Sequence, residues 1–344
     1  MAPPLYTIET NVSFPAQSAD TPLVCAVAAE FGVPRPASVI QIMKRNVASK
    51  LYRVEAEPVA LMLRAVPRDS AGPIERQCEL AADLPFEKII KPRRSRAGRY
   101  VADREGHTWM AYPAVDGEVY DGRNCSPATV IAGAIGLLDA LAKVVGEGLA
   151  DTQHRPSLWV EAVELCCSPT VASSQPAIAG ALSPEMVAAI RENRAALIDW
   201  TYTARDIAGS SRACVVHNDL NHANVLIAAG SPCFLDLEDI VREDPRVAFG
   251  HAAFKVARHA VYTGAVSADD VRQEFAPWLK QRVADTRYEG FFPYARLRII
   301  SDIAEIVFWQ IERGDPSQLH DLEKRLANLF ELEDLFGGVF GPAA

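Results

Sequence analysis

The segment 215–239 constrains the possible fold more strongly than any other part of this chain. It begins Val-Val-His217-Asn-Asp219-Leu-Asn-His-Ala-Asn224-Val-Leu-Ile and closes with Cys-Phe-Leu-Asp236-Leu-Glu-Asp. Asp219 and Asn224 share one short polar loop, so their side chains can face the same site. Asp236 follows Asn224 by twelve residues, a spacing that suits a β-hairpin. The sequence therefore predicts that a tight loop and a hairpin bring two carboxylates and one amide together.

These three side chains are of the types that phosphoryl transfer from Mg-ATP requires. One carboxylate orients the acceptor hydroxyl and takes its proton, while an amide oxygen and a second carboxylate hold magnesium on the phosphates. The competing interpretation is an ordinary loop and hairpin with surface carboxylates, since a single aspartate of this kind is more often structural. The joint pattern, together with antiparallel strands upstream, favours a phosphoryl-transfer site.

Length, charge and cysteine content limit the class of protein. The chain has 344 residues, 49% of them hydrophobic, which allows one large or two medium domains with a sizeable core. The net charge of −9 argues against general binding to nucleic acid or to an anionic membrane, because both need a basic surface. No apolar stretch approaches the roughly 20 residues of a membrane span, and the N-terminus lacks the features of a secretory signal. Seven cysteines without a C-x-x-C spacing indicate reduced thiols in a cytoplasmic protein.

The first third of the chain has the pattern of a small sheet with two helices. Asp20-Thr-Pro predicts a helix start, with Asp as the cap and Pro in the first turn. The segment from about 37 to 66 reads as an antiparallel meander with a turn at Glu57-Pro58. The expected elements are helices at 23–31 and 73–84 and strands at 37–43, 51–55, 59–65, 89–90, 100–102 and 108–112.

Beyond residue 113 the apolar alternation stops and the chain turns helical. The less periodic segment 150–182 is expected to be a loop. The expected helices are 126–145, 183–208, 247–263, 267–284, 292–313 and 315–335, with the hairpin at 225–236. We therefore predict an α+β chain with two lobes. The small N-terminal lobe, residues 1–113, holds an antiparallel sheet, and the larger C-terminal lobe, residues 114–344, is mainly helical.

The block around Asp219 resembles the catalytic and metal-binding signatures of the aminoglycoside phosphotransferase and choline kinase family. Members of this family have the protein-kinase fold and phosphorylate small molecules. Asn218 stands where protein kinases carry Arg, and no Ala-Pro-Glu follows Asp236, which favours the small-molecule group. The resemblance implies that Asp219 is the catalytic base or orients the acceptor hydroxyl. It also implies that Asn224 and Asp236 bind Mg and that His217 holds the loop.

The resemblance further assigns ATP-binding roles to the N-terminal lobe. The phosphate-covering loop corresponds to residues 45–54, which contain no glycine but offer Ser49 and backbone N–H groups. Arg64 stands where the family carries a lysine to the phosphates, and it keeps the positive charge. The acidic partner of Arg64 is expected on the following helix, where Glu79 is favoured over Glu75.

Two further regions bear on the site. Met110 and Tyr112 end the last strand of the first lobe, at a predicted hinge where an adenine ring would contact apolar walls. The segment 247–251 lacks the aspartate that many relatives carry after such a proline. Four basic residues at helical spacing are expected to form a solvated face rather than a substrate clamp: His251, Lys255, Arg258 and His259.

Three functions fit these observations. The first is an ATP- and Mg-dependent phosphotransferase that acts on a hydroxyl of a small polar metabolite, namely a sugar, an amino sugar or an amino alcohol. The second is an aminoglycoside phosphotransferase, whose cationic substrate would be held by Glu238, Asp239, Glu243 and Asp244. The third is a non-catalytic nucleotide-binding scaffold, which the missing loop glycine and Arg64 favour. The intact aspartates and Asn224 oppose it. The sequence does not predict an oligomeric state.

Overall fold

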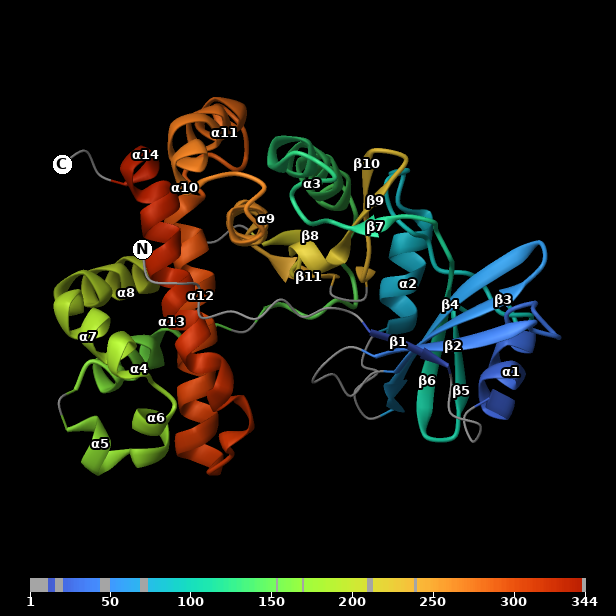
Figure 1. Cartoon of the computed structure of the whole chain (residues 1–344), viewed down its shortest axis with the longest axis horizontal. Helices are drawn as coiled ribbons and strands as arrows, with labels where there is room; N and C mark the ends of the chain where they lie inside the picture. The colour runs from blue at the N-terminus through green and yellow to red at the C-terminus, as the bar shows by residue number, and fades with distance from the viewer. Residues whose placement is uncertain are drawn as a thin grey trace.

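The chain folds into two lobes that lie side by side in Figure 1, a sheet lobe and a mainly helical lobe. The computed structural model describes residues 12–15, 21–43, 50–68, 74–152, 154–168, 170–208, 213–237 and 240–341. The predicted α+β arrangement is confirmed, with a small antiparallel sheet first and helices after it. Within the described ranges, none of the helices combines the length and apolar character needed to cross a lipid bilayer.

The N-terminal lobe is a six-stranded antiparallel sheet in the order β1-β2-β3-β4-β6-β5. Its strands are β1 Val12–Pro15, β2 Ser38–Met43, β3 Lys50–Ala56, β4 Val59–Pro67, β5 Val101–Arg104 and β6 His107–Pro113. Helices α1 (Thr21–Glu30) and α2 (Ile74–Asp83) pack on opposite faces, because side chains alternate along each strand. Leu61, Leu63 and Ala65 of β4 face α1, which leaves Met62 and Arg64 on the other face.

Helix α2 contacts both lobes. The carboxylate of Glu75 accepts hydrogen bonds from the backbone N–H groups of Tyr100 (2.9 Å) and Val101 (3.2 Å) in the sheet lobe. Two residues later, the side-chain amide of Gln77 donates to the carbonyl of Ile240 in the helical lobe at 3.1 Å. The helix therefore bridges the two lobes behind the cleft that they form.

The chain crosses into the larger lobe directly after α2 and then returns to the sheet. The N–H of Phe234 donates to the carbonyl of Lys88 at 2.8 Å, and the N–H of Ile90 donates to the carbonyl of Phe234 at 3.2 Å. The Phe86 ring packs against Phe234, and Leu84 and Ile89 belong to the core of the helical lobe. The short strand expected at 89–90 is thus an isolated pairing with the helical lobe.

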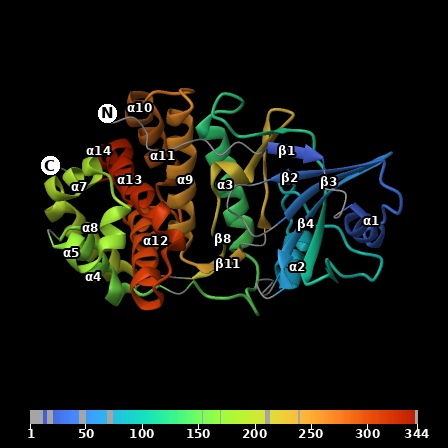
Figure 2. The same ribbon diagram turned by 60° about the horizontal axis from the view of Figure 1, so that its bottom comes forward.

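The helical lobe packs around α12 (Phe292–Arg313), which contacts α4, α8, α9 and α13. Its other helices are α3 Pro127–Leu141, α4 Pro156–Cys166, α5 Val171–Ser174, α6 Pro176–Gly180, α7 Pro184–Glu192, α8 Arg194–Ala208, α9 Pro245–Tyr262, α10 Ala268–Asp270, α11 Ala276–Val283, α13 Leu322–Leu332 and α14 Gly338–Phe340. Short strands lie at the side of this lobe that faces the sheet lobe, with β8 and β11 beside α9 and with β7, β9 and β10 beside α3 (Figures 1 and 2). They are β7 Glu118–Val119, β8 Cys214–His217, β9 Val225–Ala228, β10 Ser231–Phe234 and β11 Ile240–Glu243.

The structure corrects two expectations for the helical lobe. The segment 150–182 contains α4, α5 and α6 rather than a loop. One face of α4 is buried, and its apolar residues recur at helical spacing: Trp159, Ala162, Val163 and Cys166. The single helix expected at 183–208 is two helices, since the chain departs from helical geometry at Asn193. Ser126 and Ser183 cap α3 and α7 as their positions before proline predict.

Candidate active site

The loop that follows β8 is held by His217. This residue is fully buried, and its Nε2 lies 2.9 Å from the carbonyl oxygen of Leu235, to which it donates. Its Nδ1 accepts a hydrogen bond from the N–H of Asp219 at 3.2 Å. The two hydrogen bonds fix the imidazole tautomer and connect the loop to the end of the hairpin. Leu220 anchors the same loop in the core, so Asp219 is carried on a rigid turn.

Asp219 is surrounded by groups that favour its charged form. Asn221 Nδ2 donates to Asp219 Oδ1 at 2.8 Å, and Asn224 Nδ2 donates to the backbone oxygen and to Oδ2 of Asp219 at 2.8 and 3.2 Å. His251 Nε2 of α9 lies 3.7 Å from Asp219 Oδ1. Burial raises the pKa of Asp219, but the contacts with His251 and Asn221 outweigh it and hold this pKa well below its usual range. The group is therefore a carboxylate at neutral pH, better suited to orient a hydroxyl than to act as a strong base.

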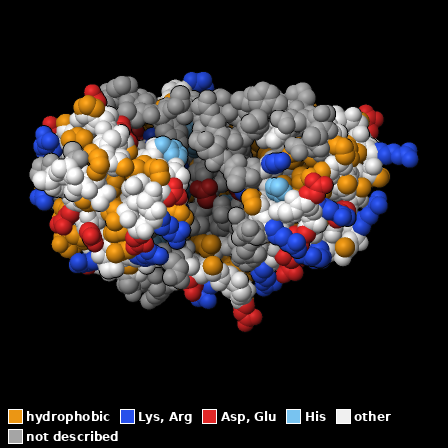
Figure 3. All heavy atoms as spheres, turned by 90° about the horizontal axis from the view of Figure 1, so that it is seen from below, with side chains coloured by type: hydrophobic (Ala, Val, Ile, Leu, Met, Phe, Trp, Pro, Cys, Tyr) orange, Lys and Arg blue, Asp and Glu red, His pale blue; other side chains and the backbone are white. Residues whose placement is uncertain are grey.

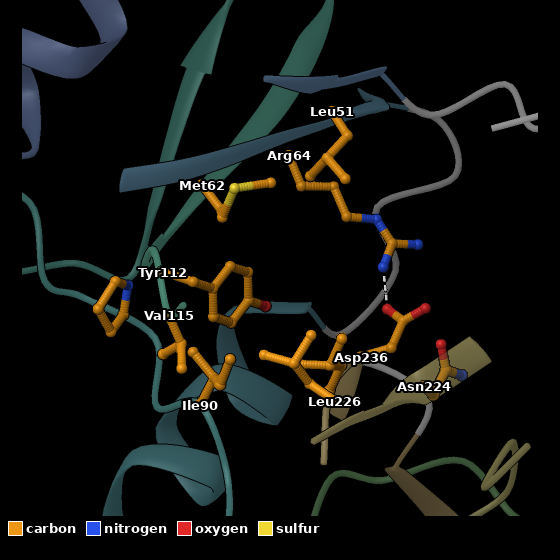
Figure 4. Close-up of a pocket in the computed structure, with 11 residues that line it drawn as sticks. Leu51, Met62, Arg64, Ile90, Tyr112, Val115, Asn224, Leu226 and Asp236 are labelled. Atoms are coloured by element: carbon orange, nitrogen blue, oxygen red, sulfur yellow. Dashed lines mark hydrogen bonds and ion pairs between the residues drawn. The ribbon is translucent and has the colours of Figure 1, made fainter. Parts of the chain in front are cut away.

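The hairpin places Asp236 beside Asn224. The N–H of Leu235 donates to the carbonyl of Asn224 at 2.9 Å, which fixes the register of the two residues. Asp236 has a backbone φ of 63°, in the left-handed region that aspartate tolerates better than most residues. This local reversal turns its carboxylate toward the sheet lobe, where it forms an ion pair with Arg64 of β4 (Figure 4).

A pocket lies between the lobes at this point and has two chemically different ends. One end is apolar and includes Tyr112 of β6, while the other holds Arg64, Asn224 and Asp236 (Figure 4). The lining residues are Leu51, Met62, Arg64, Ile90, Tyr112, Pro113, Val115, Asn224, Leu226, Leu235 and Asp236. Such a pocket suits a flat apolar ring that carries a negatively charged group at one side. The surface view in Figure 3 shows acidic atoms within the recess between the two lobes.

The donor set at the polar end fits magnesium. Asn224 uses its amide nitrogen on Asp219, which leaves its oxygen for a metal, and Asp236 adds a carboxylate. Both are hard oxygen ligands of the kind that Mg²⁺ prefers, with water and substrate phosphates completing its shell. Across the described ranges no group of three or more His, Cys, Asp or Glu side chains is arranged to hold a metal. Asn224 and Asp236 would thus leave the other coordination positions of a metal to water and to phosphate oxygens.

The predicted nucleotide-binding residues are only partly brought together. Arg64 and Tyr112 line the pocket. Met110 does not, because α2 covers that part of the sheet face and Met110 is fully buried in the core beneath it. Ser49 lies outside the described residues.

Glu79 does not lie where its predicted role requires. Its carboxylate pairs with Arg76 at 3.1 Å on the partly exposed side of α2, while Asp236 is drawn against Arg64. The expectation of an Arg64–Glu79 pair is therefore corrected. The rotation of α2 is set by Ile74, Gln77 and Cys78, which it buries, and this turns Glu79 outward.

The carboxylates expected to hold a cationic substrate have structural roles where the structure describes them. Glu243 is buried against His154 Nε2 at 2.6 Å. Asp244 caps α9 by accepting from the N–H of Arg246 at 2.9 Å and pairs with its guanidinium. Glu238 and Asp239 lie outside the described residues.

The four basic residues of α9 do not form a solvated face. His251, Lys255, Arg258 and His259 are only 5, 8, 9 and 9% exposed. The His259 ring stacks on His222 with 3.7 Å between ring centres, and Arg258 pairs with Glu331. The basic side of α9 therefore packs against the loop that carries Asp219. Helical spacing alone could not predict this, because buried and solvated charges repeat with the same period.

A two-lobe fold with an apolar cleft, a carboxylate on a rigid loop and a metal-type donor pair defines a kinase-like phosphotransferase. The chain belongs to the phosphotransferase enzyme family, whose model matches residues 48–284. The chain is therefore a kinase, a class of enzyme that binds a nucleotide. No curated protein sequence matches the chain.

Solved structures with the same fold are distant in sequence. Spectinomycin phosphotransferase APH(9)-Ia, solved with ADP and spectinomycin, is 13% identical with a TM-score of 0.60, over 92% of this chain and 98% of that one. An aminoglycoside phosphotransferase from Alicyclobacillus acidocaldarius is 11% identical with a TM-score of 0.58, over 90% and 93%. A thermostable mutant of APH(4)-Ia, solved with ADP and hygromycin B, is 13% identical with a TM-score of 0.54, over 92% and 99%. At these identities the likeness shows a shared fold.

Proposed function

We propose that the chain transfers the terminal phosphoryl group of ATP to a hydroxyl of a small polar metabolite, with Mg²⁺ as cofactor. The observation that carries this proposal is that Asn224 and Asp236 line the polar end of the interlobe pocket, while the Asn224 amide donates to Asp219 of the same loop, directly beside it. Structures of the same fold with ADP support a nucleotide in that pocket.

Each polar residue has a distinct task in this proposal. Asp219 accepts a hydrogen bond from the acceptor hydroxyl and receives its proton as the bond from the acceptor oxygen to phosphorus forms. The bond from phosphorus to the oxygen of ADP breaks in the same transfer. Asn224 and Asp236 would hold Mg²⁺, which when bound neutralises charge on the phosphates. Arg64 would leave Asp236 and bind phosphate oxygens, for which its planar donor fork is suited.

Two features of the sequence limit the class of acceptor molecule. No nucleic acid or protein acceptor is proposed, because the chain has a net charge of −9 and carries Asn218 in place of the protein-kinase arginine. Sugars, amino sugars and amino alcohols are the acceptors first proposed. Aminoglycosides are a second candidate, which the ligands named for the similar structures favour.

A direct test incubates the purified chain with ATP and Mg²⁺ and a panel of sugars, amino sugars, amino alcohols and aminoglycosides. Mass spectrometry should find a product heavier by one phosphate, and the Asp219→Asn variant should not form it. If ATP binds and no panel member is phosphorylated, the non-catalytic nucleotide-binding scaffold is the better description. If only protein substrates gain phosphate, the small-molecule assignment fails.

A further inference from the structure

Buried basic side chains meet where α9, α12 and α13 pack together, next to the loop of Asp219. Four of them are called the basic cluster below: His251 and Lys255 of α9, Arg298 of α12 and Arg325 of α13. Asp302 of α12 lies among them, 3.3 Å from Arg298 Nε and 3.0 Å from Arg325 Nη1. Burial raises the pKa of Asp302, but the charges of Arg298 and Arg325 outweigh it and lower this pKa. The cluster therefore has more basic than acidic side chains.

The cluster extends from the reacting carboxylate to the protein surface. At one end His251 Nε2 is 3.7 Å from Asp219 Oδ1, and α9 packs against the turn His222–Asn224. Burial and the charges of His259 and Lys255 lower the pKa of His222 in that turn. At the other end the side chains of Arg298 and Arg325 remain 22 and 25% exposed. The cluster therefore has one end beside Asp219 and the other at the protein surface.

Several polar groups in the cluster have no partner among the residues that the structure describes. The ammonium of Lys255 makes neither a hydrogen bond nor an ion pair there, and it lies 5.5 Å from the centre of the Phe254 ring. The Nδ1 of His251 and the Nε of Arg325 are buried without hydrogen-bond partners. The Nε of Arg298 forms the ion pair with Asp302 at 3.3 Å but no hydrogen bond. The fully buried Asn328, three residues after Arg325, leaves both its amide atoms without one.

Such groups are costly to bury unless a partner completes them. A buried cation or amide without a partner loses its hydration and gains nothing in return, which destabilises the folded protein. Burial, with the charges of Arg325, Arg258 and Lys324, lowers the pKa of Lys255 well below its usual value. A bound anion would offset this effect and accept hydrogen bonds from the unpartnered donors.

We propose that the basic cluster binds an anionic group, a carboxylate or a phosphate, on the acceptor molecule and so holds the acceptor hydroxyl at Asp219. This inference rests on the proposed phosphotransferase function and narrows its acceptors to small hydroxyl compounds that carry negative charge. A polycationic aminoglycoside would meet repulsion from Lys255, Arg298 and Arg325. The buried roles of Glu243 and Asp244 remove two carboxylates that could have countered it.

Small hydroxyl compounds that carry different charges on related skeletons test the inference, with an aminoglycoside added for comparison. The panel is glycerol, glycerate and glycerol 3-phosphate, then glucose, glucuronate, glucose 6-phosphate and glucosamine, then kanamycin. Initial rates are followed by ADP release. At least one anionic compound should have a KM roughly ten- to hundredfold below that of its neutral counterpart, the range for hydrogen bonds to charged groups. Higher turnover of neutral or cationic members than of every anionic one would overturn the inference.

Lys255→Met identifies the residue responsible. The variant should raise the KM of the anionic acceptor roughly tenfold or more, with little change for the neutral one and for ATP. Because methionine removes a buried cation at similar length, the variant should fold with at least the parent's thermal stability. The control is Lys280→Met, an exposed lysine that donates to the carbonyl of Val339 at 2.9 Å. An unchanged KM for the anionic acceptor in Lys255→Met would contradict the proposal.

A binding measurement separates this inference from the phosphotransferase proposal. With a non-hydrolysable ATP analogue and Mg²⁺ filling the nucleotide site, titration calorimetry is run with malonate and with inorganic phosphate. Saturable binding that Lys255→Met abolishes and Lys280→Met retains supports the cluster, even if no acceptor turns over. The malonate and phosphate arms show which anion is preferred. If acceptors are phosphorylated and neither anion binds, the phosphotransferase stands and the anion site is rejected.

Discussion

The guanidinium of Arg64 and the carboxylate of Asp236 form an ion pair across the cleft, 172 residues apart in the chain. The pair connects β4 of the sheet lobe to the residue that ends the hairpin of the helical lobe. In our proposal the cation serves the phosphates and the carboxylate serves the metal. Binding of Mg-ATP as proposed would exchange this ion pair for two new interactions, one between Arg64 and the phosphates and one between Asp236 and the metal.

Replacing Arg64 should weaken nucleotide binding. In Arg64→Met the phosphates lose a charged donor, and the Kd for Mg-ATP should rise roughly tenfold or more, as for other hydrogen bonds to charged groups. Calorimetry measures the change. Arg68→Met is the matched control, because Arg68 follows the same strand and pairs with Asp103 in an exposed position. Equal Kd values for Arg64→Met and the parent would contradict the phosphate role.

Asp219→Asn should keep the fold and the affinity for ATP. The amide matches the shape of the carboxylate but cannot take the acceptor proton, so turnover should fall by at least about a hundredfold. The rate with an identified acceptor and the Kd for Mg-ATP are measured on the same preparation. Turnover near that of the parent would remove the assignment of Asp219.

Asp236→Ala should abolish the dependence of nucleotide binding on Mg²⁺. Magnesium on nucleotides is usually held by one or two protein carboxylates, and Asp236 is the carboxylate beside Asn224 in the pocket. Calorimetric titrations with ATP, with and without Mg²⁺, make the comparison. A metal dependence like that of the parent would place the metal elsewhere.

His251 should make the protein less stable as the pH falls. Burial, only partly offset by Asp219, lowers the pKa of His251 from 6.5 to about 4 in the folded state. Between these values the unfolded chain binds more protons, so stability is present above pH 6.5 and is lost as the pH falls toward 4. His251→Gln should lose less free energy of unfolding over this interval, by on the order of 1 to 3 kcal/mol. Urea unfolding at pH 7 and pH 4.5 measures it, and identical losses in both proteins would refute it.

The polar end of the pocket was predictable because its geometry is local. Asp219 and Asn224 share one loop, and a two-stranded hairpin has few ways to return Asp236 to it. Arg64 was predicted from its position in the meander, and Tyr112 from its position at the end of the last strand of the lobe; both line the pocket. These predictions depend on spacing over short stretches of the chain and not on how distant segments pack together.

The remaining site residues depend on how helices turn against their neighbours. Glu75 and Glu79 share a face in sequence, but the burial of Gln77 and Cys78 decides where that face points. The contact between His251 and Asp219 joins elements that meet only in the folded chain. The spacing of residues shows which side chains share a helix face, but not which neighbour that face contacts. Neither the direction of Glu79 nor the contact between His251 and Asp219 could therefore be predicted.

The excursion of residues 84–90 into the helical lobe bears on how the protein unfolds. Leu84, Phe86 and Ile89 lie in or against that lobe's core, although sheet strands precede and follow them in the chain. A cut after residue 113 would take these side chains away from the lobe they complete and leave Gly136 and Phe234 facing a void. Neither fragment is expected to fold alone, and both lobes should melt in one cooperative transition. What looks like two domains is, in this respect, a single folding unit.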